Sequence, residues 1–524
     1  MNRDIPGYYF DAEKKKYFKI EASKTAPESA AWAATNVKRR QLEGREALAK
    51  RERVERRAAG RVKRARVLEE ALTGGFLSRE AGKLSREVVA TLWVDGVREK
   101  GCVNLFPGVA EGGGSCLSSM YVHGGDEKSG LGVVYGVVND RHLWRSYIPR
   151  DKDDVINFAD AAVRYRHTNF RPRPRSEWGT SISSLKYHEP SNKMFITSGG
   201  AWGMDHQHNF SHIRTFSPPL SDTDDLGPAW NLTEEATETI LTIPGFEDEP
   251  VNTCAPAPAS SPLTCIFGTS QGIVKYNDRG LSWLTPKPTG SGSTKHNHRS
   301  KRSRQPKETT QEAILGSAQG EILALDFFPP NPADVILYGG RAAYLGLLDQ
   351  RARPSEWSAL KHTSSIAQIR PVGGHQVLVA GPKSAMVVYD MRYIKKDHGP
   401  RDRWNMNRAR PLVTFPEYKN DAHIHTGLDV LPSAGGLGGC GIVAAAHDDG
   451  KVAVYSLRDG TRLGCPSVDK IDVGRGRGNP GGVVKSMMFN ALPGDRDASL
   501  FVGEGTLVKK YSFGRGRGEG DEWV

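Results

Sequence analysis

The feature that most constrains the fold is a hairpin pattern that recurs five times in the C-terminal half of this 524-residue chain. Each copy has an apolar run ending in a small residue, a tight turn, and a second run ending in an aromatic residue or Leu. Between the small residue and that terminal residue the interval is always eight or nine positions: Gly268 and Tyr276, Gly339 and Leu348, Gly381 and Tyr389, Ala446 and Tyr455, Gly503 and Tyr511. Unrelated β-sequence would not keep this interval, so the pattern predicts one repeated structural unit.

The repeated unit has the form of the two middle strands of a propeller blade, which are joined by a tight turn. Weaker copies at 132–147 and 194–216 raise the number of candidate blades to seven. Only the 41-residue step from Leu348 to Tyr389 has the bare period of a WD40 repeat, so the other connections are longer. The sequence therefore predicts an all-β fold, a seven-bladed WD40-type β-propeller over residues 96–524, with loop insertions at 285–311 and 393–422.

Residues 1–35 form a predicted aromatic docking segment, partly disordered. Its aromatic residues gather after a Pro-Gly turn signal and comprise Tyr8, Tyr9, Phe10, Tyr17 and Phe18. Residues 36–95 follow as a predicted basic helical arm, with a long helix over 36–72 capped by Asn36 and a second helix over 78–93. Apolar residues recur along the long helix in one narrow stripe that we expect to contact a partner: Val54, Val62, Leu68 and Leu72.

Positive charge is concentrated on this arm. Residues 38–66 hold thirteen Lys or Arg and only four acidic residues, so most of the net charge of +12 lies there. Proteins that bind nucleic acid through a folded body carry the charge across one of its faces, so the overall charge is weak support for such binding here. A solvated helix face, a protein contact and a phosphate contact all stay open for the arm.

Other function classes lose support from what the sequence lacks. The six cysteines show no paired spacing, which favours a reducing compartment, nuclear or cytoplasmic, and no apolar run is long enough for a membrane span. The histidines at 206, 208, 212, 296, 298, 423 and 425 have no Cys or acidic cluster beside them, so we expect loop residues and no metal site. No common catalytic signature occurs, and we expect a non-catalytic protein without a cofactor.

Two consecutive repeats end in a complete four-residue pattern of an apolar residue, Asp, any residue and Arg: Leu348-Asp349-Gln350-Arg351 and Tyr389-Asp390-Met391-Arg392. In this pattern the apolar residue anchors the strand end, while the carboxylate can hold the guanidinium on one rim of the propeller. Two further repeats keep the Arg but replace the acid by Asn277 and Ser456, so we expect no box there. The pattern has two interpretations, a tie within its own turn and a docking box for a partner.

The N-terminal run Ile5-Pro6-Gly7-Tyr8-Tyr9-Phe10-Asp11, followed by Lys16-Tyr17-Phe18-Lys19-Ile20, resembles the opening of one known family. This is the family of damage-specific DNA-binding protein 1 and cullin-4-associated factor 4, also called WD repeat-containing protein 21. The resemblance covers the first 70 residues and, more loosely, the last 200, whereas residues 95–260 match poorly. It implies a substrate receptor of a cullin-4 RING E3 ubiquitin ligase that docks on the damaged-DNA-binding adaptor through the two boxes and presents an unknown protein substrate.

Two questions stay open at this level. The first concerns the N-terminal part of the chain. Either the helix over 36–72 inserts into the adaptor, or the segment 5–20 clamps the receptor's own propeller. The alternative function is a WD40 scaffold in an RNA or chromatin complex, in which residues 38–66 bind phosphate by charge alone.

Overall fold

A computed structural model describes most of the chain. It describes residues 8–11, 16–21, 32–59, 86–107, 115–124, 131–151, 153–164, 169–177, 181–199, 213–220, 230–232, 234–243, 250–285, 321–329, 333–353, 357–393, 409–432, 441–475, 482–492, 495 and 497–513. The chain divides into two compact units, Met1–Leu68 and Glu69–Val524.

In the first unit, a small hairpin folds against a helix. Strands β1 (Tyr8–Asp11) and β2 (Lys16–Lys19) pair in antiparallel register, and helix α1 spans Ala34–Ala59. The helix begins two residues before the predicted cap Asn36. A ring of Phe18 stacks on Trp32 with centroids 4.9 Å apart, and Arg40 donates to the Tyr9 hydroxyl.

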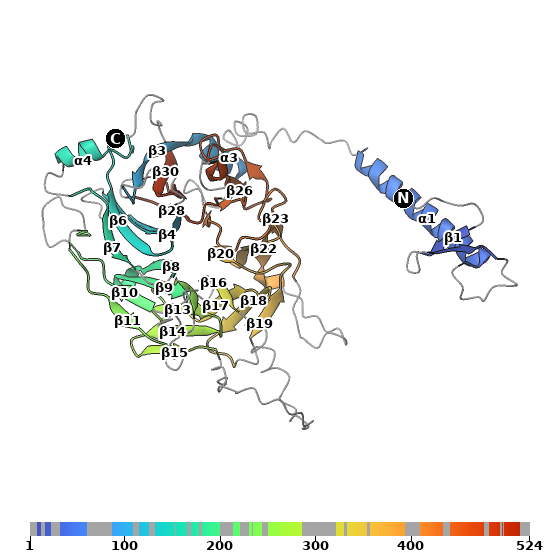
Figure 1. Ribbon diagram of the computed structural model, residues 1–524, viewed down its shortest axis with the longest axis horizontal. Coiled ribbons are helices and arrows are strands. Elements are labelled where there is room, and N and C mark those ends of the chain that lie inside the picture. The colour runs from blue at the N-terminus through green and yellow to red at the C-terminus, as the bar shows by residue number, and fades with distance from the viewer. Residues whose placement is uncertain are drawn as a thin grey trace, which may run out of the picture. The chain divides into compact units, whose positions relative to one another are not determined.

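The second unit consists of seven four-stranded antiparallel sheets, which confirms the predicted propeller (Figure 1). Blades are numbered in chain order, and their strands run from the channel outward as a, b, c and d. Their bounds are: blade 1, β4 (Leu117–His123), β5 (Gly132–Val138), β6 (His142–Ile148), β7 (Arg173–Glu177); blade 2, β8 (Ser181–His188), β9 (Lys193–Gly199), β10 (Ile213–Phe216), β11 (Thr239–Leu241); blade 3, β12 (Val251–Pro256), β13 (Cys265–Thr269), β14 (Ile273–Asn277), β15 (Gly280–Trp283); blade 4, β16 (Ile322–Phe327), β17 (Val335–Gly340), β18 (Tyr344–Asp349), β19 (Ser358–Lys361).

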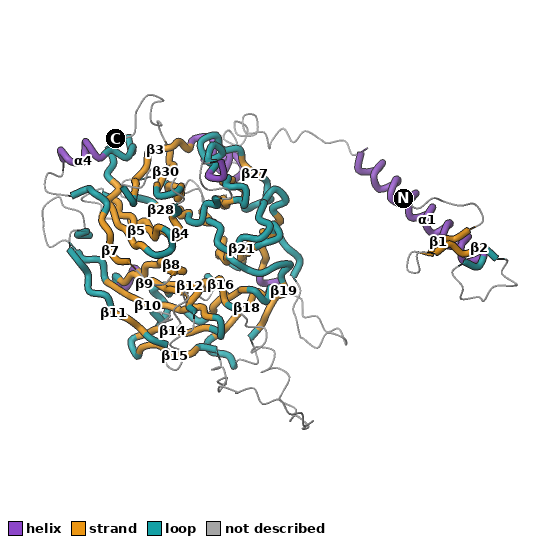
Figure 2. The backbone as a smooth tube through the Cα atoms, in the orientation of Figure 1, coloured by secondary structure: helices purple, strands orange, loops and turns teal. Residues whose placement is uncertain are grey.

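The remaining blades follow the same plan: blade 5, β20 (Gln368–Gly373), β21 (Gln376–Gly381), β22 (Ala385–Asp390), β23 (Val413–Thr414); blade 6, β24 (Leu428–Leu431), β25 (Ile442–Ala446), β26 (Val452–Ser456), β27 (Arg462–Leu463); blade 7, β28 (Met487–Asn490), β29 (Ser499–Glu504), β30 (Leu507–Phe513), β3 (Val97–Asn104). All seven predicted hairpins are strands b and c of a blade. Figure 2 shows the strands of successive blades lying around the ring.

Blade 7 closes the ring with a strand from the other end of the propeller unit. Strand β3 pairs with β30, with Val97 opposite Phe513 and Asn104 opposite Leu507. Strand β3 is the outermost strand of blade 7, so the start of the propeller unit pairs with its end. A propeller closed in this way leaves only short strand edges.

Helix α3 (Arg86–Gly96) belongs with the propeller rather than with the arm. Its Trp93 is 1% exposed and packs in one core cluster with Val94, Val454 and Leu500. The expected arm–propeller boundary at residue 95 therefore falls inside a helix that the propeller core covers. A second short helix, α4 (Phe158–Arg164), lies between strands β6 and β7 of blade 1.

The structure describes only part of the two predicted loop insertions, 285–311 and 393–422. Residues 286–320 and 394–408 lie outside the described part of the chain. The expected loop at 393–422 is not a loop throughout, because Val413 and Thr414 form strand d of blade 5. No helix in the described ranges is both long and apolar enough to cross a membrane.

Candidate protein-interaction rim

The two D-x-R boxes lie on the same face of neighbouring blades. Each strand c pairs with its strand b in the same register, with Leu348 opposite Ile336 and Tyr389 opposite Val377. Because strands alternate in direction within a blade, every strand c ends on the face where strand a also ends. We call this face the box rim.

In blade 4, Asp349 holds Arg351 in a bidentate pair. The carboxylate accepts Arg351 Nε at 3.0 Å and Nη2 at 2.8 Å, and it also accepts the backbone N–H of Arg351 at 3.0 Å. Asp334 lies 3.4 Å from Arg351 Nη1. Leu348 is fully buried and anchors the strand, while the Arg351 side chain stays 59% exposed.

Blade 5 repeats this geometry. Asp390 accepts Arg392 Nε at 3.0 Å, Nη2 at 2.7 Å and the backbone N–H at 3.1 Å. Tyr389 is buried and its hydroxyl meets His362 Nδ1 at 3.0 Å, whereas the Arg392 side chain is 56% exposed. The guanidinium of Arg392 also lies 5.5 Å from the ring of Tyr393, which is 70% exposed.

Both pairs stay charged over the ordinary pH range. The hydrogen bonds from Arg351 lower the pKa of Asp349, and those from Arg392 lower the pKa of Asp390. Each Asp therefore ties its own turn, as one sequence interpretation held. Because each guanidinium keeps an exposed edge, the tie also presents a fixed, planar cation to solvent.

The replaced boxes differ as expected. Within the described residues, Asn277 accepts the backbone N–H of Arg279, at 3.0 Å, and Ser456 accepts the backbone N–H of Arg458, at 3.2 Å. The structure adds Arg150, which follows Tyr147 at the same spacing in blade 1 and which the sequence reasoning missed. Arg150 turns inward to Asp154, at 2.8 Å, so it offers no exposed counterpart to Arg351.

The predicted docking segment is partly described. Tyr8 and Tyr17 are 47% and 38% exposed, whereas Tyr9 and Phe18 contact the α1 region as described above. Phe10 lies in β1, and its side chain is not among those described. Of the predicted contact stripe, Val54 lies in α1 without a described side chain, and Val62, Leu68 and Leu72 lie outside the described residues.

The described residues hold no cluster of three His, Cys, Asp or Glu side chains that could bind a metal ion. The predicted loop histidines His423 and His425 lie between blades 5 and 6, and the histidines at 206, 208, 212, 296 and 298 lie outside the described ranges.

No family model matches the chain, and no curated protein matches its sequence. Among solved structures, the WD40 beta propeller domain of Doa1 is similar with a TM-score of 0.46 and 11% identity, over 80% of this chain and 97% of that one. The computationally designed Ika8 protein is similar with a TM-score of 0.41 and 12% identity, over 79% of this chain and 99% of that one.

The strand order, the ring closure and the repeated register define the class. The chain is a seven-bladed WD40-type β-propeller, a fold whose rigid ring of loops typically serves as a non-catalytic scaffold for protein interactions.

Proposed function

We propose that this protein is a substrate receptor of a cullin-4 RING E3 ubiquitin ligase that docks on the damaged-DNA-binding adaptor through Arg351 and Arg392. One observation carries the proposal. Two neighbouring blades each present an exposed guanidinium that a bidentate carboxylate fixes in place. The resemblance of residues 5–20 to the receptor family supports the same reading, and a nuclear or cytoplasmic location would suit it.

The proposed role is proximity rather than catalysis. A receptor that holds a substrate beside the ligase raises the local concentration of its lysines near the charged conjugating enzyme. Fixed arginines suit such docking because little side-chain entropy is lost when a preformed guanidinium meets its partner.

We expect the double variant Arg351→Glu with Arg392→Glu to bind the purified adaptor at least about tenfold more weakly than the wild type, since buried arginines are frequent hot spots at interfaces. Surface plasmon resonance with the full chain measures this. The matched control is Arg279→Glu, which changes the same position in blade 3, where Asn277 replaces the acid.

The control is expected to bind as the wild type does. Wild-type affinity in the double variant would overturn the proposal, and so would equal losses in the control, which would indicate a general charge effect. If the protein instead binds RNA, with an affinity that falls steeply as the salt concentration rises, the scaffold function is favoured.

A further inference from the structure

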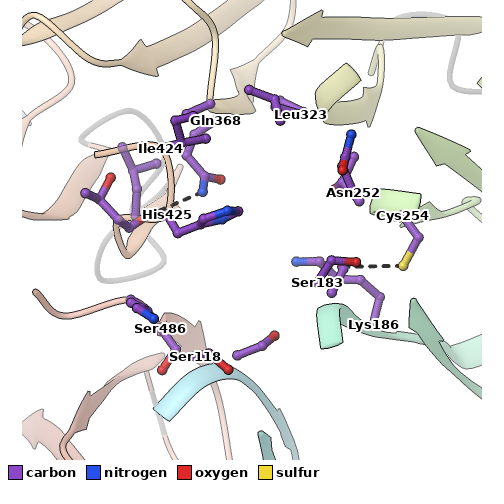
Figure 3. A pocket seen from close by; sticks show the side chains of 18 of the residues that line it. Ser118, Ser183, Lys186, Asn252, Cys254, Leu323, Gln368, Ile424, His425 and Ser486 are labelled. Carbon is purple, nitrogen blue, oxygen red and sulfur yellow. Dashed lines mark hydrogen bonds between the residues drawn. The ribbon is translucent and has the colours of Figure 1, made fainter. Parts of the chain in front are cut away.

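The propeller channel contains a polar cavity of about 130 Å³. Its lining comes from the beginnings of the a strands and the segments before them, for example Ser118, Ser183 and Asn252 (Figure 3). The boxes lie where strands a and c end, so the cavity lies toward the opposite face of the propeller from the box rim. It is therefore a separate site from the one proposed above.

Four a strands carry a charged residue at one equivalent register position. Lys186 pairs with Phe195, Asp326 with Leu337, Arg370 with Leu378 and Asp429 with Ala444, each opposite the third residue of the described strand b. These residues form a belt of mixed charge within the channel. The two cations of the belt line the cavity, whereas its two carboxylates do not.

All charged residues in the described lining are basic. It includes three cations, Lys186, Arg370 and Lys485, and contains neither Asp nor Glu. His425 adds a ring N–H, and its neutral form is favoured because burial, followed by the charge of Lys485, lowers its pKa. Figure 3 shows His425 and Lys186 on different sides of the same space.

The three cations are not equally neutralised. Arg370 Nε lies 3.4 Å from an Asp429 oxygen, and Lys485 Nζ lies 3.7 Å from Asp140. Lys186 makes no ion pair or hydrogen bond with any other described residue, although burial and the nearby charge of Arg370 lower its pKa. The charges of Asp429 and Asp326 act on Lys186 in the opposite direction, but neither carboxylate is in direct contact with its ammonium group. A bound anion in contact with this ammonium would offset part of its desolvation cost.

We propose that this cavity binds a small phosphate, either the free ion or the phosphate group of a small monoester, with Lys186 as its principal contact. The volume equals the share of about four waters, which is enough for one phosphate group. Lys186 supplies a compact charge with three donors, Lys485 adds a second cation, and the neutral His425 ring can donate one hydrogen bond.

Isothermal titration of the full chain with sodium phosphate, against sodium chloride at equal ionic strength, tests the proposal. We expect the wild type to bind phosphate and Lys186→Met to bind at least about tenfold more weakly, because a hydrogen-bonded charge pair is lost. The matched control Lys361→Met removes an exposed lysine on β19 and should leave binding unchanged.

Glycerol 3-phosphate is the second ligand to be titrated. Tighter binding of the monoester would identify an organic phosphate, and equal binding would identify the free ion.

A stability measurement separates binding from folding. The melting temperature of Lys186→Met without phosphate shows whether the variant folds, because Lys186 also acts on the charges of Asp326 and Asp429. If that variant fails to fold, Lys485→Gln, at a position 29% exposed, gives the second test and should also weaken binding. Absence of phosphate binding by the wild type, or equal binding by Lys186→Met, would overturn the proposal. Binding of hexaglutamate without phosphate binding would also overturn it and would indicate an acidic chain segment as the occupant.

Discussion

Replacing Lys510 by Met is expected to destabilise the propeller by about 3–5 kcal/mol, because it leaves two carboxylates in a buried site with one cation fewer. Lys510 is fully buried on β30, with Nζ 2.5 Å from Asp154 and 3.4 Å from Asp495. Arg150 pairs with both carboxylates, and Ser512 donates to Asp154 at 2.6 Å. Equilibrium urea unfolding at pH 7 measures the change.

This cluster lies where the ring closes. Asp154 lies between strands β6 and β7 of blade 1, whereas Asp495 and Lys510 belong to blade 7, so the ion pairs join the first and last blades of the propeller. Burial alone would raise the pKa of Asp154, but Lys510 and the hydrogen bonds from Ser512 and Arg150 hold it below its ordinary value. Burial lowers the pKa of Lys510, which marks the desolvation cost that its carboxylates must offset.

A double-mutant cycle isolates the pair. Asp154→Asn should cost less in the Lys510→Met background than in the wild type, since its main cation is already absent. Lys361→Met, at an exposed position, should change stability by less than about 0.5 kcal/mol. A change of under about 1 kcal/mol for Lys510→Met would show that the cluster does not hold the ring closed.

The blades could be predicted because each hairpin is a local event. A strand, a turn and a return strand place the small residue and the terminal Tyr or Leu at a fixed interval, and that interval is readable without knowing the fold. The closing strand β3 could not be predicted from the sequence, because its pairing is not local. Its partner β30 lies some 400 positions away, and Arg98, Glu99 and Lys100 interrupt its apolar pattern.

The same distinction separates the two candidate sites. In each box the Asp and the Arg stand two positions apart, so the pairs Asp349–Arg351 and Asp390–Arg392 were predictable from spacing. The channel cations come from different blades, and only ring closure brings Lys186 near Arg370. Likewise, helix α3 was predicted as part of the arm because its pattern does not reveal that Trp93 meets the last blades.

Stability is expected to fall as the pH drops from about 6.5 toward 4, because His362 is buried in its neutral form. The ring is 3% exposed, its Nδ1 meets the Tyr389 hydroxyl at 3.0 Å, and burial lowers its pKa from 6.5 to about 4. A group whose pKa is lower in the folded state stabilises the fold above its unfolded pKa and loses that contribution as the pH falls. The difference corresponds to about 3 kcal/mol when the ring is fully protonated.

Urea unfolding between pH 7 and pH 4 measures this slope, and His362→Asn tests its origin. Asn offers a polar group near the position of Nδ1 but does not titrate, so the variant should lose most of the slope that His362 contributes. His423→Asn, at an exposed position, should keep the wild-type slope.

Asp349 and Asp390 have lowered pKa values, so any stability that depends on their charge is lost only at lower pH than the His362 contribution. A wild-type slope in His362→Asn would show that the pH dependence does not arise from His362, whose ring bonds to the first residue of the blade 5 box.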